Sequence, residues 1–125
     1  MSKLLKVDNI MYKVSDLKKS EKFYTDILGL KKAWEDMDAQ MIGFIFEQSD
    51  SEIVIHNNPD ISKFDYSYLV EDVASFCDEI RKQGHKVVLE PMEVRSGKYA
   101  VIADPDGNEI PVIDLTKFNG KPKYN

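Results

Sequence analysis

The stretch "YKVSD", residues 12–16, recurs as "YLVED" at residues 68–72, and this repeat decides the fold. Each copy ends in an aspartate, Asp16 or Asp72. Apolar residues at helical spacing follow each aspartate and stop at a glycine. Aspartate is a preferred N-cap residue, and glycine readily takes the left-handed conformation that ends many helices. We therefore predict one helix after each aspartate.

Strand-like segments surround both predicted helices. In the first half they are residues 6–14, 30–35, 40–47 and 52–57, and in the second half 65–71, 86–90, 98–103 and 108–114. Two β-α-β-β-β copies predict an α+β domain in which tandem modules form a concave mixed sheet with helices on its outer face. The predicted divisions are module 1 (5–57), a linker (58–64), module 2 (65–115) and a C-terminal tail (116–125).

Composition favours a single compact domain. The 125 residues are 42% hydrophobic and 31% charged, with a net charge of −5. The absence of a basic stripe argues against nucleic acid as a partner, and the apolar runs are too short for a membrane partner. The start, "MSKLLKVDNI", lacks the apolar core of a signal peptide. The one cysteine, Cys77, fits a reducing compartment and reads as a core residue, so we expect a cytoplasmic protein.

Two motifs carry a resemblance to a known family. "DNIMYKVSDLKKSEKFYTDILGL", residues 8–30, resembles the opening strand and helix of the vicinal oxygen chelate superfamily, which includes glyoxalase I, ring-cleaving dioxygenases and bleomycin-resistance proteins. "GKYAVIADPDGNEI", residues 97–110, is similar to the closing hairpin of that family. With the repeat between them, the motifs cover nearly the whole chain. The resemblance implies the same paired-module fold.

The resemblance also implies where a metal would bind. Enzymes of the family hold a metal by four side chains on four strands, commonly His or Gln, Glu, His and Glu. Those positions correspond here to Asn9, Val54, Asp65 and Pro111. Valine and proline have no side-chain donor, and one asparagine with one aspartate makes a poor site for a divalent transition metal. We therefore predict no metal, no cofactor and no catalytic residue.

Strand alternation indicates which side chains line the concave face. The predicted ligand-binding residues are Asn9, Met11, Lys13, Trp34, Met41, Ile45, His56, Asp65, Ser67, Tyr99, Val101 and Pro111. Apolar walls with few polar groups are typical of small-molecule sites. Trp34, Tyr99 and Asp65 favour a planar cationic aromatic ligand, whereas Lys13 would favour an anionic one. We interpret His56 as a hydrogen-bonding wall residue and expect His85, after the second helix, to face water.

Acidic side chains gather in "EDMD", residues 35–38, and at Glu47, Asp50 and Glu52 on a neighbouring hairpin. Charges at hairpin tips are usually solvated, or they protect strand edges from aggregation. We interpret this cluster as solvent-exposed, with attraction of cationic ligands as a second role.

Three functions remain open on this evidence. The missing donors favour a metal-free protein that binds or sequesters a small aromatic or cationic molecule, and they argue against an enzyme. The first alternative is a metal-dependent lyase or dioxygenase of the same superfamily with relocated ligands. The second is an interaction domain without a small ligand. The resemblance and the open sheet edges also predict a homodimer.

Overall fold

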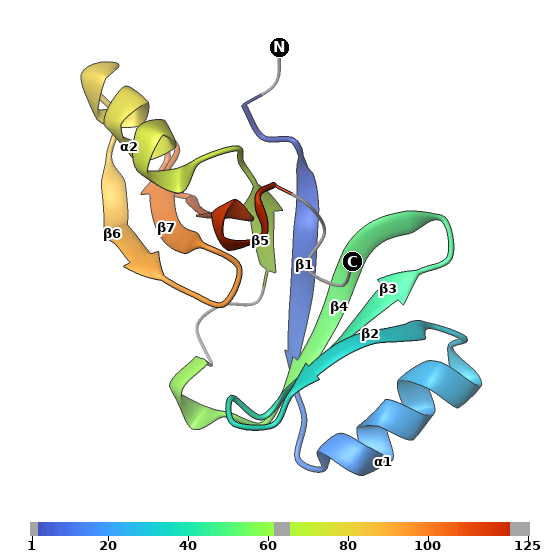
Figure 1. The fold of residues 1–125 in the computed structure, drawn as a ribbon. Helices are drawn as coiled ribbons and strands as arrows, with labels where there is room; N and C mark the ends of the chain where they lie inside the picture. The colour runs from blue at the N-terminus through green and yellow to red at the C-terminus, as the bar shows by residue number, and fades with distance from the viewer. Residues whose placement is uncertain (1–2, 62–65, 121–125) are drawn as a thin grey trace. The chain divides into compact units, whose positions relative to one another are not determined.

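The computed structural model describes residues 3–61 and 66–120 (Figure 1). The chain divides into two compact units, Asp8–Tyr66 and Ser67–Lys123, the second of which also includes the chain up to Val7. Each unit corresponds to one copy of the predicted repeat. The division falls inside the first strand, because the backbone N–H of Leu5 donates to the carbonyl of Leu69, 2.8 Å away.

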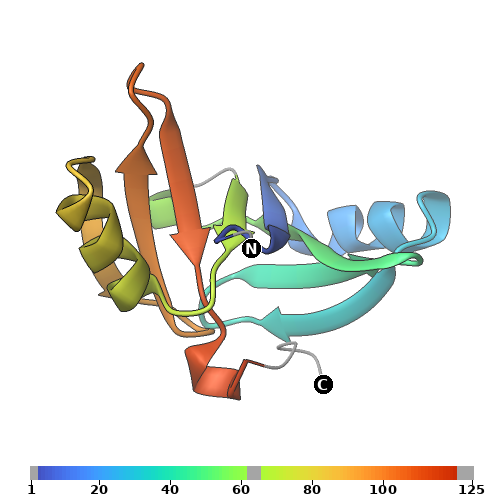
Figure 2. The ribbon, with the colours of Figure 1, turned by 90° about the horizontal axis from the view of Figure 1, so that it is seen from above.

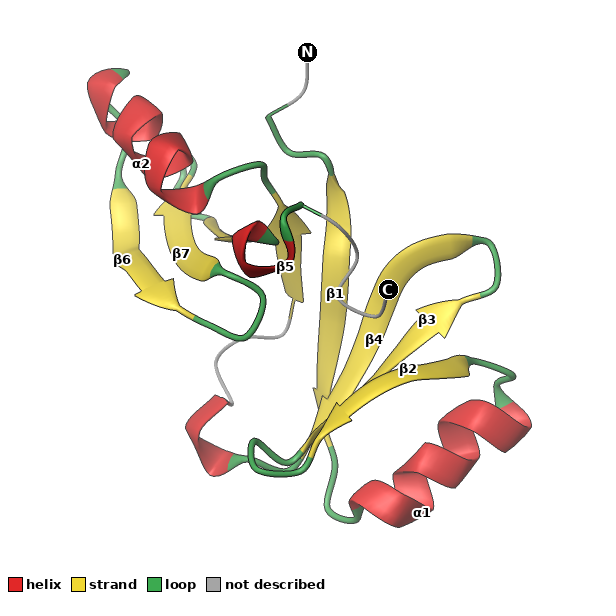
Figure 3. Ribbon diagram, viewed as in Figure 1, coloured by secondary structure: helices red, strands yellow, loops and turns green. Residues whose placement is uncertain are grey.

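The first module contains six elements. They are β1 (Lys6–Lys13), α1 (Leu17–Lys22), η1 (Phe23–Ile27), β2 (Lys31–Asp36), β3 (Met41–Phe46) and β4 (Ser49–His56). The strands are hydrogen-bonded in the order β2-β3-β4-β1, with β4 and β1 parallel and the other pairs antiparallel. Helix α1 packs on β3 and β4 (Figure 3).

The second module repeats this topology. After η2 (Pro59–Ile61) come β5 (Tyr66–Leu69), α2 (Val73–Lys82), β6 (Val87–Glu93), β7 (Lys98–Ala103), β8 (Glu109–Ile113) and η3 (Thr116–Phe118). The strand order is β5-β8-β7-β6, and α2 packs against β6 and β7 (Figures 1 and 2). All eight strands belong to one mixed sheet, so the α+β fold class is confirmed. A concave face formed by the two modules stays a prediction.

Both helices begin where the repeat predicts. The side chain of Asp16 accepts a hydrogen bond from the backbone N–H of Lys19, and that of Asp72 accepts one from Ser75. Each bond satisfies one of the N–H groups that the first helical turn leaves unpaired. A glycine in the left-handed conformation follows each helix. Gly29 in the first module has a φ of 75°, and Gly84 in the second has a φ of 85°.

The first helix differs from the prediction in its second half. After Lys22 it continues as a π-helix, in which the N–H of Leu28 donates to the carbonyl of Phe23. The wider turn changes the direction of the side chains that follow. As a result Phe23 and Ile27 stay exposed, while Leu17 alone of the α1 residues is buried.

Each module has its own apolar core between helix and sheet. In the first, Leu17 packs with Ile42, Phe44 and Ile55. In the second, α2 contributes Val73, Phe76 and Cys77, and the strands contribute Val70, Ala100, Ile102 and Val112. Burial raises the pKa of the Cys77 thiol, as expected for a core cysteine.

A buried aspartate ties the second module together. Oδ2 of Asp114 accepts from the backbone N–H of Val73 at the start of α2, 2.8 Å away. Oδ1 accepts from the N–H of Lys98, at 2.9 Å, and from both the N–H and the hydroxyl of Thr116. A Cβ on Gly97 would lie 1.9 Å from this oxygen, so only glycine fits beside it. Asp114 therefore joins α2, β7 and the chain after β8.

No helix in the described parts of the chain is long and apolar enough to cross a membrane.

Candidate functional site

One face of the first module carries most of the predicted residues. In the parallel register, Asn9, Met11 and Lys13 of β1 pair with Glu52, Val54 and His56 of β4. Met41, Gly43 and Ile45 of β3 pair with His56, Val54 and Glu52 of β4. Because paired residues point to the same side of a sheet, these side chains share one face, opposite α1. We call this surface the open face of module 1.

A β-bulge places Trp34 on the open face. Lys32 pairs with Phe44 and Trp34 pairs with Gly43, so Ala33 is the extra residue on β2. Bulges commonly redirect one side chain relative to its neighbours. Without this one, Trp34 would point to the same side as Lys32, toward α1.

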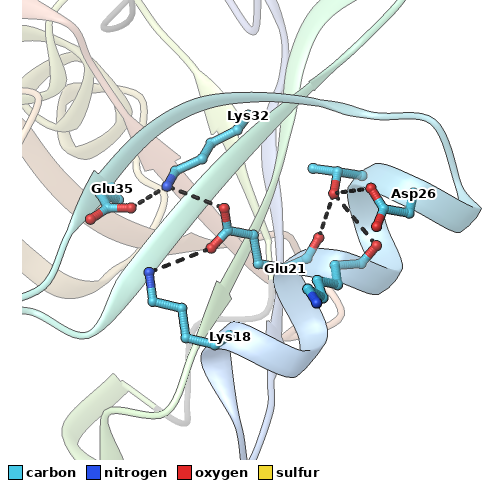
Figure 4. Close-up of polar contacts among 7 residues, drawn as sticks. Lys18, Glu21, Asp26, Lys32 and Glu35 are labelled. Carbon is cyan, nitrogen blue, oxygen red and sulfur yellow. Dashed lines mark hydrogen bonds and ion pairs between the residues drawn. The ribbon is translucent and has the colours of Figure 1, made fainter.

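The ion pairs of β2 confirm the direction of its other side chains. Lys32 contacts Glu35, and its Nζ lies 3.2 Å from Glu21 of α1, whose carboxylate also lies 3.8 Å from Lys18 (Figure 4). The hydrogen bond with Glu35, followed by the contacts with Glu21, raises the pKa of Lys32, and Lys32 lowers that of Glu35. Lys32 and Glu35 thus flank Trp34 in sequence but face the helix.

Glu52 is the charged group buried in the open face. Only 1% of its surface is exposed, and its Oε1 accepts a hydrogen bond from Nε1 of Trp34, 2.8 Å away. The interpretation of Glu52 as a solvated hairpin charge is therefore wrong. Strand β4 begins at Ser49 rather than at residue 52, because the turn after Phe46 is short. Glu52 thus lies inside the strand, with its side chain on the same side as Val54 and His56.

Asn9 lies directly beside Glu52 on the neighbouring strand. It is 5% exposed, and its Nδ2 donates to Oδ2 of Asp8, 2.8 Å away, which is also buried. The structure thus brings a carboxamide and a carboxylate together at one point of the open face. This polar pair was not predicted, although the parity of Glu52 with Val54 and His56 in "SEIVIH" would have indicated it.

His56 is also buried, with 2% exposure. Its Nδ1 accepts a hydrogen bond from the N–H of Asn58, 3.3 Å away. In the neutral imidazole the proton is therefore on Nε2, which makes that atom a hydrogen-bond donor. His56 stands four strand positions from Glu52 on the same face, and its predicted role in the wall of a binding site stays a prediction.

The second module has a corresponding face with fewer polar groups. Val101 pairs with Pro111, and the neighbouring pair Tyr68 and Val112 places Ser67 beside Pro111. Ser67, Tyr99, Val101 and Pro111 are buried and share this face. Asp65, the remaining predicted residue, lies outside the described residues. A role for these twelve residues in ligand binding stays a prediction.

The donor set decides whether the family's metal fits. Val54 and Pro111, at two of the four implied positions, offer no donor. Asn9, at a third, offers an amide oxygen, and the Glu52 carboxylate lies outside the four positions. Among residues 3–61 and 66–120, no three His, Cys, Asp or Glu side chains are grouped so that they could hold a metal ion. The described residues therefore do not fit a four-ligand metal, and the absence of a metal stays a prediction that elemental analysis can check.

A groove of about 440 Å³ lies elsewhere in the second module. Its lining comes from the loop after α2, from β6 and from the turn between β7 and β8: Gly84, His85, Lys86, Val88, Ala103, Asp104, Pro105, Gly107 and Glu109. His85 is exposed, as predicted. The pKa of Asp104 is lowered, first by its side-chain hydrogen bond with Asn108 and then by backbone N–H groups of the turn. These bonds stabilise the turn, and the groove contains none of the predicted binding residues.

The class of this protein follows from its two four-stranded βαβββ modules. The first of them holds a buried carboxylate on the sheet face opposite its helix. Residues 6–112 match the sequence pattern of the Glyoxalase/Bleomycin resistance protein/Dioxygenase superfamily. The chain belongs to this superfamily. The resemblance and the fold that it implies are thereby confirmed.

Curated relatives and solved structures agree with this assignment. The chain is 36% identical to a probable lactoylglutathione lyase of Synechocystis sp. over 121 residues, which cover 85% of this chain and 92% of the relative. It is 28% identical to the lactoylglutathione lyase of Haemophilus influenzae, with 88% and 93% covered. Among solved structures, a methylmalonyl-CoA epimerase from Mycobacterium tuberculosis has a TM-score of 0.64 at 19% identity, covering 90% of this chain and 89% of that one.

These relatives overturn the predicted function. We predicted a protein that binds or sequesters a ligand without acting on it, whereas the curated relatives that match 85–88% of the chain are lactoylglutathione lyases, one of them probable. The prediction relied on the donors at the four implied positions. It did not place Glu52, a buried carboxylate two residues before Val54, on this face.

Proposed function

We propose that the protein is a lyase of the glyoxalase superfamily that acts on a small thioester of the lactoylglutathione type, with Glu52 as the group that carries the proton. The similarity to lactoylglutathione lyases over 85–88% of the chain supports the reaction class. The buried Glu52 carboxylate supports the role, because the indole of Trp34 holds its Oε1 on the open face of module 1.

The chemistry of such a substrate calls for proton transfer between two adjacent carbons. A lyase breaks the C–S bond of lactoylglutathione without adding water, so it must release the thiol and a three-carbon 2-oxoaldehyde. Before that bond breaks, the hydrogen on carbon 2 of the lactoyl group moves to carbon 1 as a proton, and the hydroxyl proton on carbon 2 moves to the oxygen of carbon 1. The hemithioacetal that results then releases the thiol, which takes up the hydroxyl proton of carbon 1 as the C–S bond breaks. A carboxylate beside both carbons can take the proton from one and return it to the other. We assign this transfer to Glu52.

The surroundings of Glu52 suit this task. The indole of Trp34 holds Oε1 in place, and Met11, Met41 and Ile45 add apolar surface to the same face. A buried carboxylate is shielded from bulk water, so its electrostatic interaction with a bound substrate is stronger than at the surface. His56 lies on the same face, four strand positions from Glu52.

Activity assays test this proposal directly. The purified protein is incubated with lactoylglutathione, and in the reverse direction with glutathione and the 2-oxoaldehyde, while ultraviolet absorbance follows the thioester. In deuterated water we expect deuterium at the carbon that receives the proton, detected by mass spectrometry. If no thioester is consumed or formed in either direction, even at high protein concentration, the proposal is contradicted.

We also propose a cytoplasmic homodimer, supported by the single cysteine and by the family membership. Two chains of 14.4 kDa predict a particle of about 29 kDa. Multi-angle light scattering at micromolar concentration measures this mass, and a value near that of one chain would contradict the dimer.

A further inference from the structure

The contact between Trp34 and Glu52 depends on three separate features of the first module. The first is the bulge at Ala33, which turns the indole onto the open face. The second is Gly43, on which the indole rests. The third is the hydrogen bond from Nε1 to Oε1 of Glu52, at 2.8 Å. An arrangement that needs all three is more specific than ordinary packing of a half-buried tryptophan.

Gly43 is glycine because the indole occupies the place of a side chain. A Cβ at this position would lie 2.1 Å from Nε1 and 2.2 Å from Cε2 of Trp34, far inside van der Waals contact. Its φ is not in the left-handed region, so the backbone itself would accept another residue. Gly43 is therefore required by the close approach of Trp34 and not by backbone conformation.

We propose that Trp34 is a positioning residue that fixes Oε1 of Glu52 and thereby sets the orientation of its carboxylate toward the substrate, with Gly43 and the bulge serving to seat the indole. This inference rests on the proposed function, because it assumes that the Glu52 carboxylate transfers the proton. A carboxylate that can rotate about its last bond presents its oxygens in many directions, whereas a hydrogen bond from the rigid indole narrows that range.

The kinetic test uses Trp34→Phe, which keeps an aromatic ring but removes the N–H donor. We expect kcat to fall about 10- to 100-fold while KM changes by less than about threefold, because orientation of the base is lost and the binding surface is kept. The matched control is Tyr24→Phe, which removes a polar group from an aromatic ring on the α1 side of the sheet and should leave kcat unchanged. Tyr24 stacks on Phe44, 5.5 Å between ring centroids.

A double-mutant cycle separates positioning from stability. In the Glu52→Gln background, Trp34→Phe should cause no further loss of kcat, because there is no base left to position. If Trp34→Phe lowers kcat by the same factor in both backgrounds, or leaves kcat unchanged in the wild type, the inference is wrong. Gly43→Ala should reproduce the loss of kcat seen with Trp34→Phe, and full activity in Gly43→Ala would also contradict it.

A spectroscopic test is independent of activity. Trp34 is the only tryptophan, so a ¹⁵N-labelled sample gives a single indole N–H signal. We expect Glu52→Gln to move that signal strongly, whereas Glu47→Gln, which changes an exposed glutamate in the turn before β4, should leave it in place. A signal that Glu52→Gln does not move overturns the positioning contact. A signal that moves in a protein without lyase activity overturns the proposed function and keeps the contact.

Discussion

Replacing Glu52 with glutamine is expected to lower kcat for lactoylglutathione turnover by about 10²- to 10⁴-fold, the range typical for loss of a general base. Glutamine has nearly the shape of glutamate and can still accept a hydrogen bond from the indole of Trp34 through its amide oxygen. It cannot take a proton from carbon. We therefore expect the fold and KM to change little, while deuterium exchange at the substrate carbon is lost.

The measurement compares steady-state rates and circular dichroism spectra of wild type and variant. Glu47→Gln is the control, because it makes the same chemical change at an exposed position of the same hairpin. A Glu52→Gln variant that retains more than about a tenth of the wild-type kcat would show that another group carries the proton.

The second large effect concerns stability. Replacing Asp114 with alanine should lower the free energy of unfolding by about 3 kcal/mol, because it leaves the N–H groups of Val73, Lys98 and Thr116 without their acceptor. The buried N–H of Val73 costs about 1–3 kcal/mol when it loses its partner, and the two part-buried bonds contribute about 0.5–1.5 kcal/mol each. The variant is also expected to lose the link between the start of α2 and β7.

Urea unfolding followed by circular dichroism gives the free energy directly. Asp106→Ala, in the exposed turn between β7 and β8, removes the same side chain where it is solvated and should change stability by less than about 0.5 kcal/mol. Equal stability of the two variants would mean that the hydrogen bonds of Asp114 contribute little. Gly97→Ala should also lower the free energy of unfolding, because its Cβ would clash with Oδ1 of Asp114.

The local signals of the chain were sufficient to predict its elements. The N-cap aspartates, the glycines after the helices and the alternating apolar residues act over a few positions, and they predicted both helices and all eight strands to within about three residues. The repeat of residues 12–16 at 68–72 then indicated two modules of equal topology. The exception is the π-helical end of the first helix, where a wider turn keeps the helical hydrogen bonds but exposes Phe23 and Ile27.

The candidate site depended on contacts that no local signal contains. The bulge at Ala33 arises from pairing with β3 and turns Trp34 to the open face. The start of β4 at Ser49 depends on the same strand, and it changes Glu52 from a predicted surface charge into a buried carboxylate beside Asn9. Sequence by itself thus determined the elements, their order and the family, because these follow from short-range propensity and periodicity. Only tertiary structure decided which carboxylate is buried and what holds it, because strand register brings together residues that are far apart in the chain.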